Sequence, residues 1–392
     1  MTVTLTLSRS QISIEREVFN ALFSDSVVAS RAGVTSALDG KALAFGTFLA
    51  LAREAEIPYP LFFAPLDVVE AQIRLKREKL MSGFTKKSFS ANARHSVHLR
   101  DIELIVKDLL RKQALLRQYD SRLGTNELVG LLKGSRGQVE EDAGRVAAAI
   151  DLVRTEMRRR EKKSAALEYF IGRLEANQVF VAQSARHFMP QNVPSHVNFS
   201  GLALKDRKAP FIFLASGDEG ERMEPAGRRL FTLTLMTVLV ARGVFSPVNY
   251  DGHTKELSSS REYDIAAEIL MPIDEMRTMR FPDLQSVKDA ADLMKVTPSA
   301  VAMRARRTER IGHVTFETYM DQLRDEYRGT QKPRFGNPKP VNAIKKYNGV
   351  ECSRRMLAIL DAGHIDGTRF RQIMFSNKPR SPDINEFRQA VA

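Results

Sequence analysis

The sequence predicts an α+β protein that is mostly helical and has one small sheet near its middle. Apolar residues recur at helical spacing over much of the chain, most regularly over 99–118. Two short apolar runs, 199–204 and 209–215, have instead the length and composition of buried strands. They follow the segment 174–181, which reads as a helix leading into a strand. Many helices around few strands favour a helical protein with a small sheet core.

The composition is that of an ordinary globular protein. The chain has 392 residues, enough for two to three domains, and 43% of them are hydrophobic and 27% charged. Cys352 is the only cysteine, so an intrachain disulfide is excluded and a reducing compartment is expected. The first residues lack a basic segment followed by a long apolar one, and no apolar stretch reaches membrane length. We expect a cytoplasmic protein with no membrane partner.

The chain is strongly basic. It contains 60 Lys and Arg against 47 Asp and Glu, which gives a formal net charge of +13 and a pI near 9.8. Basic proteins of this kind often contact nucleic acid by neutralising its phosphates. The alternative is that the charge serves solubility alone. The excess of basic over acidic residues makes DNA an expected partner.

Residues 12–66 are predicted to form helices broken by turns. The segments 34–41 and 45–55 place apolar residues at helical spacing, and the prolines that begin at Pro58 end the last helix. The stretch 20–33 makes a poor recognition helix, because it contains Asp25 and no basic cluster. This part is therefore as well suited to packing as to reading DNA.

Residues 67–167 form a basic helical region. A second long helix is predicted over 138–175, and basic runs along it fit either a solvated helix face or phosphate contacts. Its candidate DNA-binding residues are Arg158, Arg159 and Arg160. His95 and His98 lack a third donor, so they do not predict a metal site.

An uncharged run of twelve residues, Leu230–Ala241, lies between arginines in the middle of the chain. The alternation of Phe231, Leu233 and Leu235 with threonines favours a buried strand, whereas the length of the run favours a helix. It is too short to span a bilayer, which takes about 20 residues. In either form it is expected to be a core element.

This run and the later segment 262–272 together resemble the ImmA/IrrE family of metallopeptidase-like regulators. The resemblance is carried by Phe231-Thr232-Leu233 before an apolar helix and by the later Ala-Ala-Glu-Ile-Leu-Met-Pro at 266–272. A Phe-Ser-Gly strand at 199–201 and a Pro-x-Ile strand at 210–212 precede them in the family's order. The resemblance implies a zincin-like domain over 168–328. In the family, two histidines and a further glutamate bind zinc, and another glutamate works on the bound water.

The chain departs from that family at the zinc site itself. The two histidines fall on Leu235 and Leu239, and the catalytic glutamate falls on Met236. The third ligand falls on Arg261, or on Glu262 after a one-residue slip. Leucine has no lone pair for zinc, and methionine cannot take a proton from water. The resemblance therefore implies a degenerate peptidase core with no metal, no cofactor and no catalytic residues.

Residues 282–310 have a helix-turn-helix-like pattern. Thr297 is suited to cap a helix and Pro298 to its first position, and the helix that follows is markedly basic. Its candidate DNA-binding residues are Arg304, Arg306, Arg307 and Arg310. A packed structural helix fits the pattern equally well, and the family has a helix with an arginine beside its core in this place.

The resemblance extends less specifically to both ends of the chain. Residues 1–66 are similar to a degenerate form of the helix-turn-helix module that often precedes the peptidase-like domain. Beyond a linker rich in Pro, Gly and Lys at 329–340, residues 341–392 are expected to form a small helical C-terminal module.

Three functions remain open. The first is a catalytically inactive regulatory protein that binds DNA, a protein partner or both, in a phage, mobile-element, stress-response or toxin–antitoxin setting. The second is a metallopeptidase with a rearranged metal site built from His253, Glu262 or Glu268. The third is a toxin–antitoxin subunit that binds only protein, such as a repressor, toxin or antitoxin partner.

Overall fold

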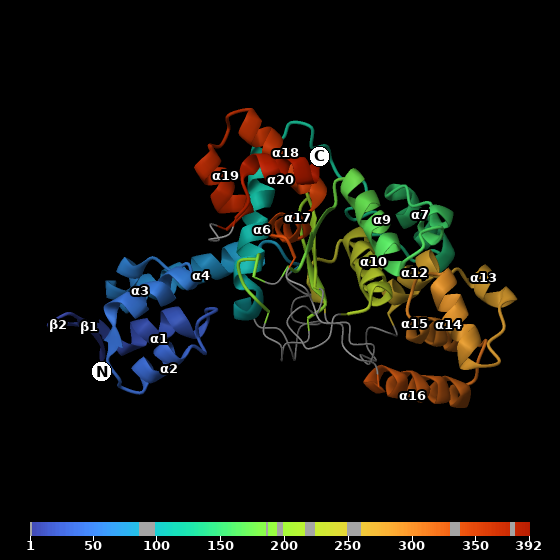
Figure 1. Ribbon diagram of the computed structural model, residues 1–392, viewed down its shortest axis with the longest axis horizontal. Coiled ribbons are helices and arrows are strands. Elements are labelled where there is room, and N and C mark those ends of the chain that lie inside the picture. The colour runs from blue at the N-terminus through green and yellow to red at the C-terminus, as the bar shows by residue number, and fades with distance from the viewer. Residues whose placement is uncertain are drawn as a thin grey trace.

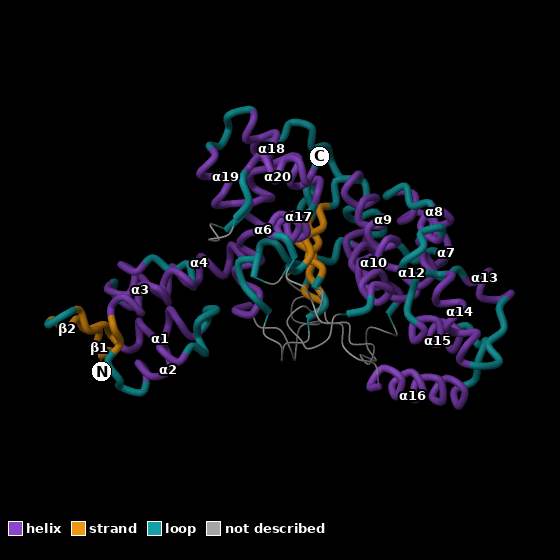
Figure 2. The backbone as a smooth tube through the Cα atoms, viewed as in Figure 1, coloured by secondary structure: helices purple, strands orange, loops and turns teal. Residues whose placement is uncertain are grey.

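A computed structural model describes residues 2–85, 99–185, 187–193, 199–215, 224–248, 260–329, 338–376 and 381–392. Helices predominate around two small sheets, which confirms the mostly helical α+β class (Figures 1 and 2). His95, His98, His253 and most of the expected linker lie outside the described residues. Within the described part, no helix combines the length and apolarity needed to cross a membrane.

The central sheet has four short strands: β4 (Phe180–Gln183), β5 (Gly201–Leu204), β6 (Phe211–Leu214) and β7 (Pro247–Val248). Their order is β4-β6-β5-β7, with β4 parallel to β6 and the other pairs antiparallel. The strands predicted near 179–181, 199–204 and 209–215 are therefore confirmed.

Side chains alternate strictly between the two faces of this sheet. Val181, Ile212 and Leu214 belong to one hydrophobic cluster, whereas Phe180 and Phe211 belong to another on the opposite face. This is the two-residue period of an extended strand. Because every residue of β4, β5 and β6 is buried, helices must cover both faces.

Helices from distant parts of the chain form these two covers, as Figure 1 shows. The hydrophobic cluster on the first face takes side chains from α7 (Val139–Ala149), α8 (Arg154–Arg158), α9 (Lys163–Ala176), α10 (Ala226–Arg242), α12 (Arg261–Leu270), α13 (Ile273–Thr278), α14 (Leu284–Leu293), α15 (Pro298–Arg307) and α16 (His313–Gly329). Of these helices, α9 and α10 pack against the strands, whereas α14, α15 and α16 lie farther from the sheet. The second face is covered by α4 (Leu66–Met81), α6 (Leu99–Tyr119), α17 (Pro340–Asn348), α18 (Val350–Asp361), α19 (Gly367–Met374) and α20 (Ile384–Val391). The C-terminal module is thus helical, as expected, and shares its core with α6 and the sheet.

The ambiguous uncharged run is helical. It forms most of α10, a helix whose residues from Arg229 to Ala241 are all buried. The hydroxyls of Thr234 and Thr237 donate to the carbonyls of Leu230 and Leu233, at 2.9 and 2.8 Å. These bonds within the helix satisfy two of its three buried threonine hydroxyls, so Thr234, which suggested a strand, is compatible with a buried helix.

Two details of the predicted secondary structure are wrong. The single helix expected over 138–175 is three helices, α7, α8 and α9. The first break lies at Asp151, which has a φ of 47°, and the second at residues 159–162. The segment 12–15, expected to be helical, belongs to a hairpin of β1 (Thr2–Leu7) and β2 (Ser10–Glu15). The alternating Thr, Val and Leu of β1 has the period of a strand.

The N-terminal module has its own small core. Its sheet of β2, β1 and β3 (Leu43–Ala44) packs with α1 (Arg16–Ser24), α2 (Ala32–Leu38), α3 (Phe45–Glu54) and η1 (Tyr59–Phe63). Phe19, Phe23, Phe48 and Phe62 form its buried aromatic centre. A salt bridge from Lys107 to Glu56, at 2.8 Å, links this module to α6.

The C-terminal module is joined to α9 by a buried carboxylate. Glu175 accepts a hydrogen bond from the backbone N–H of Glu351, in the first turn of α18, at 3.2 Å. A helix N-terminus favours a negative charge, but burial dominates here and raises the pKa of Glu175 from 4.5 to about 7. Gly349, whose φ is 78°, makes room for this carboxylate, because a Cβ there would collide with it.

We expect the protein to lose stability as the pH rises from about 5 to about 8. Folded Glu175 keeps its proton up to a higher pH than the unfolded chain does, so the folded state loses stability as this carboxyl ionises. The loss corresponds to about 3 kcal/mol. Glu175→Gln should flatten this dependence in urea unfolding, whereas Glu168→Gln, at an exposed position of the same helix, should leave it unchanged. An equal pH dependence in wild type and Glu175→Gln would contradict the assignment.

Candidate functional site: a filled cleft and an internal arginine network

The positions that carry the zinc site in the resembled family lie inside the protein. Leu235, Met236 and Leu239 on α10 have exposed fractions of 0, 0 and 4%. They belong to the hydrophobic cluster that joins α9, α10 and α12 to the first face of the sheet. Side chains that offer no donor, in a place that water does not reach, cannot bind or activate a metal-bound water.

Met236 also fills the space next to the sheet. It packs on Gly201 at the start of β5, where an added Cβ would lie 2.8 Å from the Met236 Cε and 2.9 Å from its Sδ. The same Cβ would collide with the carbonyl oxygen of Phe213 on the neighbouring strand. Only glycine at position 201 lets the methionine and the two strands approach this closely.

The two candidates for a third ligand take part in other interactions. Arg261 binds Asp142 on α7, with an N–O distance of 2.8 Å. Glu262 pairs with Arg242 at the end of α10, at 3.2 Å. Across the described residues, no group of three or more His, Cys, Asp or Glu side chains is arranged to hold a metal ion.

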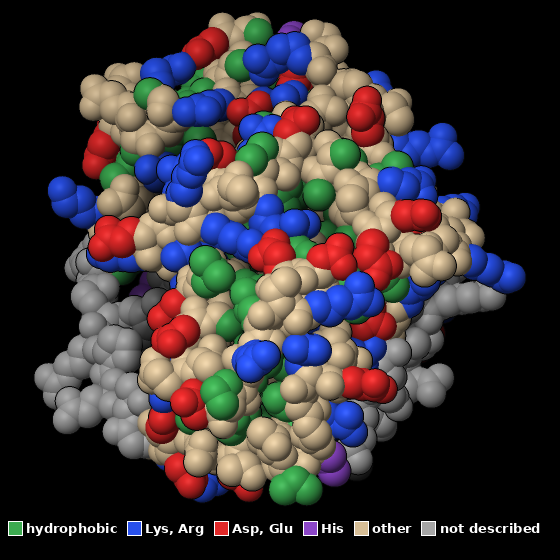
Figure 3. Space-filling view, turned by 90° about the vertical axis from the view of Figure 1, so that its right-hand side faces the viewer, with side chains coloured by type: hydrophobic (Ala, Val, Ile, Leu, Met, Phe, Trp, Pro, Cys, Tyr) green, Lys and Arg blue, Asp and Glu red, His purple; other side chains and the backbone are tan. Residues whose placement is uncertain are grey.

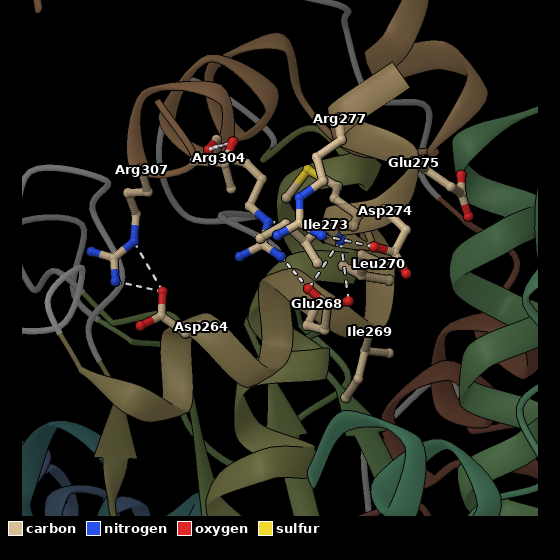
Figure 4. A network of polar contacts seen from close by, with 12 residues as sticks. Asp264, Glu268, Ile269, Leu270, Ile273, Asp274, Glu275, Arg277, Arg304 and Arg307 are labelled. Atoms are coloured by element: carbon tan, nitrogen blue, oxygen red, sulfur yellow. Dashed lines mark hydrogen bonds and ion pairs between the residues drawn. The ribbon is translucent and has the colours of Figure 1, made fainter. Parts of the chain in front are cut away.

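Glu268 is the most enclosed carboxylate on α12, and Figure 4 shows what surrounds it. Both of its oxygens lie 3.1 Å from the backbone nitrogen of Ile273, and one of them also accepts from the guanidinium of Arg304. Arg304 reaches it from α15, with its Nε donating to the Met271 carbonyl at 3.2 Å. Burial raises the pKa of Glu268, and the Ile273 N–H and Arg304 oppose that rise.

Two arginines of α8 reach the same turn from the other side. Arg158 binds Glu275 at 2.6 Å and donates to the Leu270 carbonyl at 3.1 Å. Arg154 donates to the Ile269 carbonyl at 3.0 Å. The last carbonyls of α12 have no partner within their own helix, so these cations satisfy groups that would otherwise be unpaired. Arginines from two distant segments therefore fix the turn between α12 and α13.

The predicted DNA-binding arginines divide into an internal and an external group. Arg158 and Arg304 are internal, because their side chains are only 14 and 6% exposed and bind Glu275 and Glu268. Both guanidinium groups also donate to backbone carbonyls, so their charge is used within the fold. Arg307 is intermediate: its Nε binds Asp264 at 2.9 Å, and its guanidinium lies 5.6 Å from the ring centre of Tyr263.

The external group consists of three exposed arginines, Arg159, Arg160 and Arg310, and the less exposed Arg306. Arg159, just after α8, pairs with Glu156 of that helix, and Arg160 lies over the ring of Tyr169 at 5.1 Å. Arg310 donates to the Met279 carbonyl at 3.3 Å and stays exposed. Arg306 is half-buried at the end of α15. Among the contacts of the described residues, these four side chains share no partner. Of the two predicted basic clusters, Arg158 and Arg304 are the members that reach the same turn, between α12 and α13.

The helix-turn-helix-like pair itself is present. Its first helix is α14 and its second is α15, and the Thr297 side chain caps α15 by accepting from the Ala300 N–H. Half of the residues of α15 are buried: Ala300, Val301, Ala302, Arg304 and Ala305. The adjoining end of the molecule carries acidic and basic side chains side by side (Figure 3). This favours the packed structural helix among the two interpretations of the sequence.

Comparisons of the chain with protein-family models, with curated proteins and with solved structures find no match. The likeness to the ImmA/IrrE family therefore stands on the quoted sequence segments alone. Sequence reasoning also missed the partnership of Glu268 and Arg304. A signal existed, because a glutamate within Ala-Ala-Glu-Ile-Leu is placed among core residues and needs a buried cation.

Met236→Glu should destabilise the protein by several kcal/mol, because it buries a carboxylate among hydrocarbon side chains. Met236→Leu, a matched apolar control, should cost less than about 1.5 kcal/mol. The free energy of unfolding in urea measures both. Added zinc should not rescue Met236→Glu, since Leu235 and Leu239 offer no ligand. If Met236→Glu were as stable as wild type, the space around position 236 would contain water rather than packed apolar side chains.

Proposed function

We propose that this protein is a catalytically inactive regulator that acts by binding, with nucleic acid as its main ligand and a protein partner as a second one. The observation that carries the proposal is the apolar filling of α10 at Leu235, Met236 and Leu239. A chain that has replaced donors and base by hydrocarbon retains a scaffold without hydrolytic chemistry. The family likeness supports a phage, mobile-element, stress-response or toxin–antitoxin setting and a cytoplasmic location.

The net charge supports nucleic acid as the ligand. An excess of 13 positive charges remains after every acidic residue is counted. Arg306 and Arg310 lie four residues apart at the end of α15, where a helix and the turn after it could face a phosphate backbone. In this proposal Arg304 and Arg158 have a structural role, because they donate hydrogen bonds to the backbone carbonyls of the turn after α12.

The competing hydrolase has weaker support. Glu262 and Glu268 each bind an arginine and lie six residues apart on α12, so they project from different sides of the helix. A toxin–antitoxin subunit that binds only protein remains the other alternative. Capture of the same partner with and without nuclease treatment separates it from the DNA-binding proposal, since a protein–protein complex survives digestion.

Purified protein should contain far less than one zinc per chain, and a chelator should change neither its melting temperature nor any function. Elemental analysis after purification without added metal measures the first point. Glu262→Ala should have the same metal content as wild type, because Glu262 binds Arg242 rather than an ion. Stoichiometric zinc that falls in Glu262→Ala would instead establish the rearranged metal site.

Affinity for duplex DNA should fall steeply with salt. If about six phosphates are neutralised, the slope of log K against log salt is about −5. Arg306→Ala combined with Arg310→Ala should make this slope shallower by about 2. Arg324→Ala with Arg328→Ala is the matched control, because those arginines are also four residues apart but each is paired with an aspartate of α16. A wild-type affinity that is absent or independent of salt would contradict DNA binding.

A further inference from the structure

A second basic surface lies at the turn that connects β5 to β6, far in sequence from both predicted DNA-binding clusters. Lys205, Arg207 and Lys208 are exposed on this turn, whereas Asp206 between them is enclosed. The residues on either side, Leu204 and Ala209, are fully buried. The turn therefore presents three cations and no apolar side chain to solvent.

The turn is held in one conformation by contacts on three sides. Asp206 Oδ1 accepts from the backbone nitrogens of Lys208 and Ala209, at 2.7 and 2.9 Å. The Lys205 N–H donates to the Gly83 carbonyl at 2.7 Å, and the Arg207 carbonyl accepts from the Asn126 N–H at 2.8 Å. A fixed backbone lowers the entropy that the three cations lose when they bind a ligand.

The end of α6 and the loop after it add two more cations to this surface. Arg117 binds Asp206 at 3.2 Å and Arg122 binds Asp120 at 3.0 Å. The two arginine side chains are 59 and 63% exposed, but their carboxylate partners are only 8 and 3% exposed. The buried carboxylates thus hold the two arginine side chains in place, while the guanidinium groups face solvent. Asp120 is also bound by Arg355, at 2.8 Å, which offsets its charge further.

The balance of exposed charge distinguishes this surface from the helix-turn-helix-like end. Segments 117–127 and 205–210 contain one exposed carboxylate, Glu127, against five exposed cations. At the other end, basic side chains pair with carboxylates that are themselves exposed, as in Arg277–Asp274 and Arg324–Asp321. An anion approaching that end meets both signs, whereas one approaching the β5–β6 turn meets mainly positive charge.

We propose that the β5–β6 turn and the end of α6 bind the phosphate backbone of duplex nucleic acid. Arginine and lysine at fixed positions are the usual donors to phosphates. Tyr119, the aromatic residue of these segments, stacks on His364 with ring centres 4.7 Å apart, so its ring already has a partner. Stacking on aromatic side chains is how single-stranded bases are bound, and this surface lacks such a free ring among its described residues. The inference rests on the proposed nucleic-acid function and adds a second surface to the contacts proposed for Arg306 and Arg310.

The test compares two triple variants with the same change in net charge. Lys205→Gln, Arg207→Gln and Lys208→Gln together remove the cations of the turn but keep Asp206, which fixes its backbone. Arg9→Gln, Lys41→Gln and Arg53→Gln together remove three exposed cations of the N-terminal module. Binding of full-length protein to labelled duplex DNA is measured from about 50 to about 200 mM salt. Urea unfolding of both variants establishes that they are folded.

We expect the turn variant to lose at least about tenfold in affinity and to show a slope shallower by about 2 to 3. The N-terminal variant should change affinity by less than about twofold. If wild type binds DNA and the turn variant binds equally well, this surface assignment is overturned and the proposed function survives. If wild type binds no DNA at any salt concentration, both fail. Loss of binding only to an acidic protein, or only to vesicles containing phosphatidylserine, would overturn it in favour of those partners.

Discussion

The structure depends on covering both faces of a very short sheet. Strands of four residues expose many backbone groups at their edges and bury little by themselves, so the sheet is stable only within its helical layers. Segments from most of the chain supply these layers: α6 and α17 to α20 on one face, α9, α10 and α12 on the other. This constraint explains why the run Leu230–Ala241 of α10 has no charged residue on any side. It lies between the sheet and α12, and every residue of the run is buried.

A second constraint follows from the way α12 ends. A buried helix end leaves carbonyl groups without partners, and the short connection to α13 has no room for a long cap. Arginines from α8 and α15 occupy this place, with Glu268 and Glu275 balancing part of their charge. A pair of buried charges contributes little net stability compared with apolar residues, but the loss of one partner is costly. The network therefore specifies how α8, α12 and α15 fit together more than it strengthens the fold.

Periodicity predicted the helices and strands wherever one pattern was regular. The apolar side of α6, the positions of β4, β5 and β6 along the chain, and the Thr297 cap of α15 all follow from local sequence. Periodicity failed where a single residue ends a helix, as at Asp151. It was ambiguous where the helical and the strand period both fit the sequence, as in α10. The candidate site was harder to predict than the fold. The burial of Leu235 and Met236 follows from their apolar side chains. No local pattern shows that Arg304 binds Glu268 rather than a phosphate, because that contact depends on how α12 and α15 pack.

Basic residues therefore have two roles in this protein, one inside the fold and one at the surface. Clusters of basic residues in the sequence do not show which residue has which role. Arg158 and Arg304 stand in the most basic runs, yet their charges are used inside the fold. Lys205, Arg207 and Lys208 stand in an inconspicuous turn, yet that turn is fixed, exposed and nearly free of exposed acid. The difference arises from where the carboxylates lie. A carboxylate buried beneath an exposed arginine, as Asp120 is beneath Arg122, leaves the guanidinium facing solvent. When the arginine itself is buried, as Arg304 is with Glu268, its charge is used inside the protein. The surface available to an anionic ligand is set by this geometry rather than by the local density of arginine.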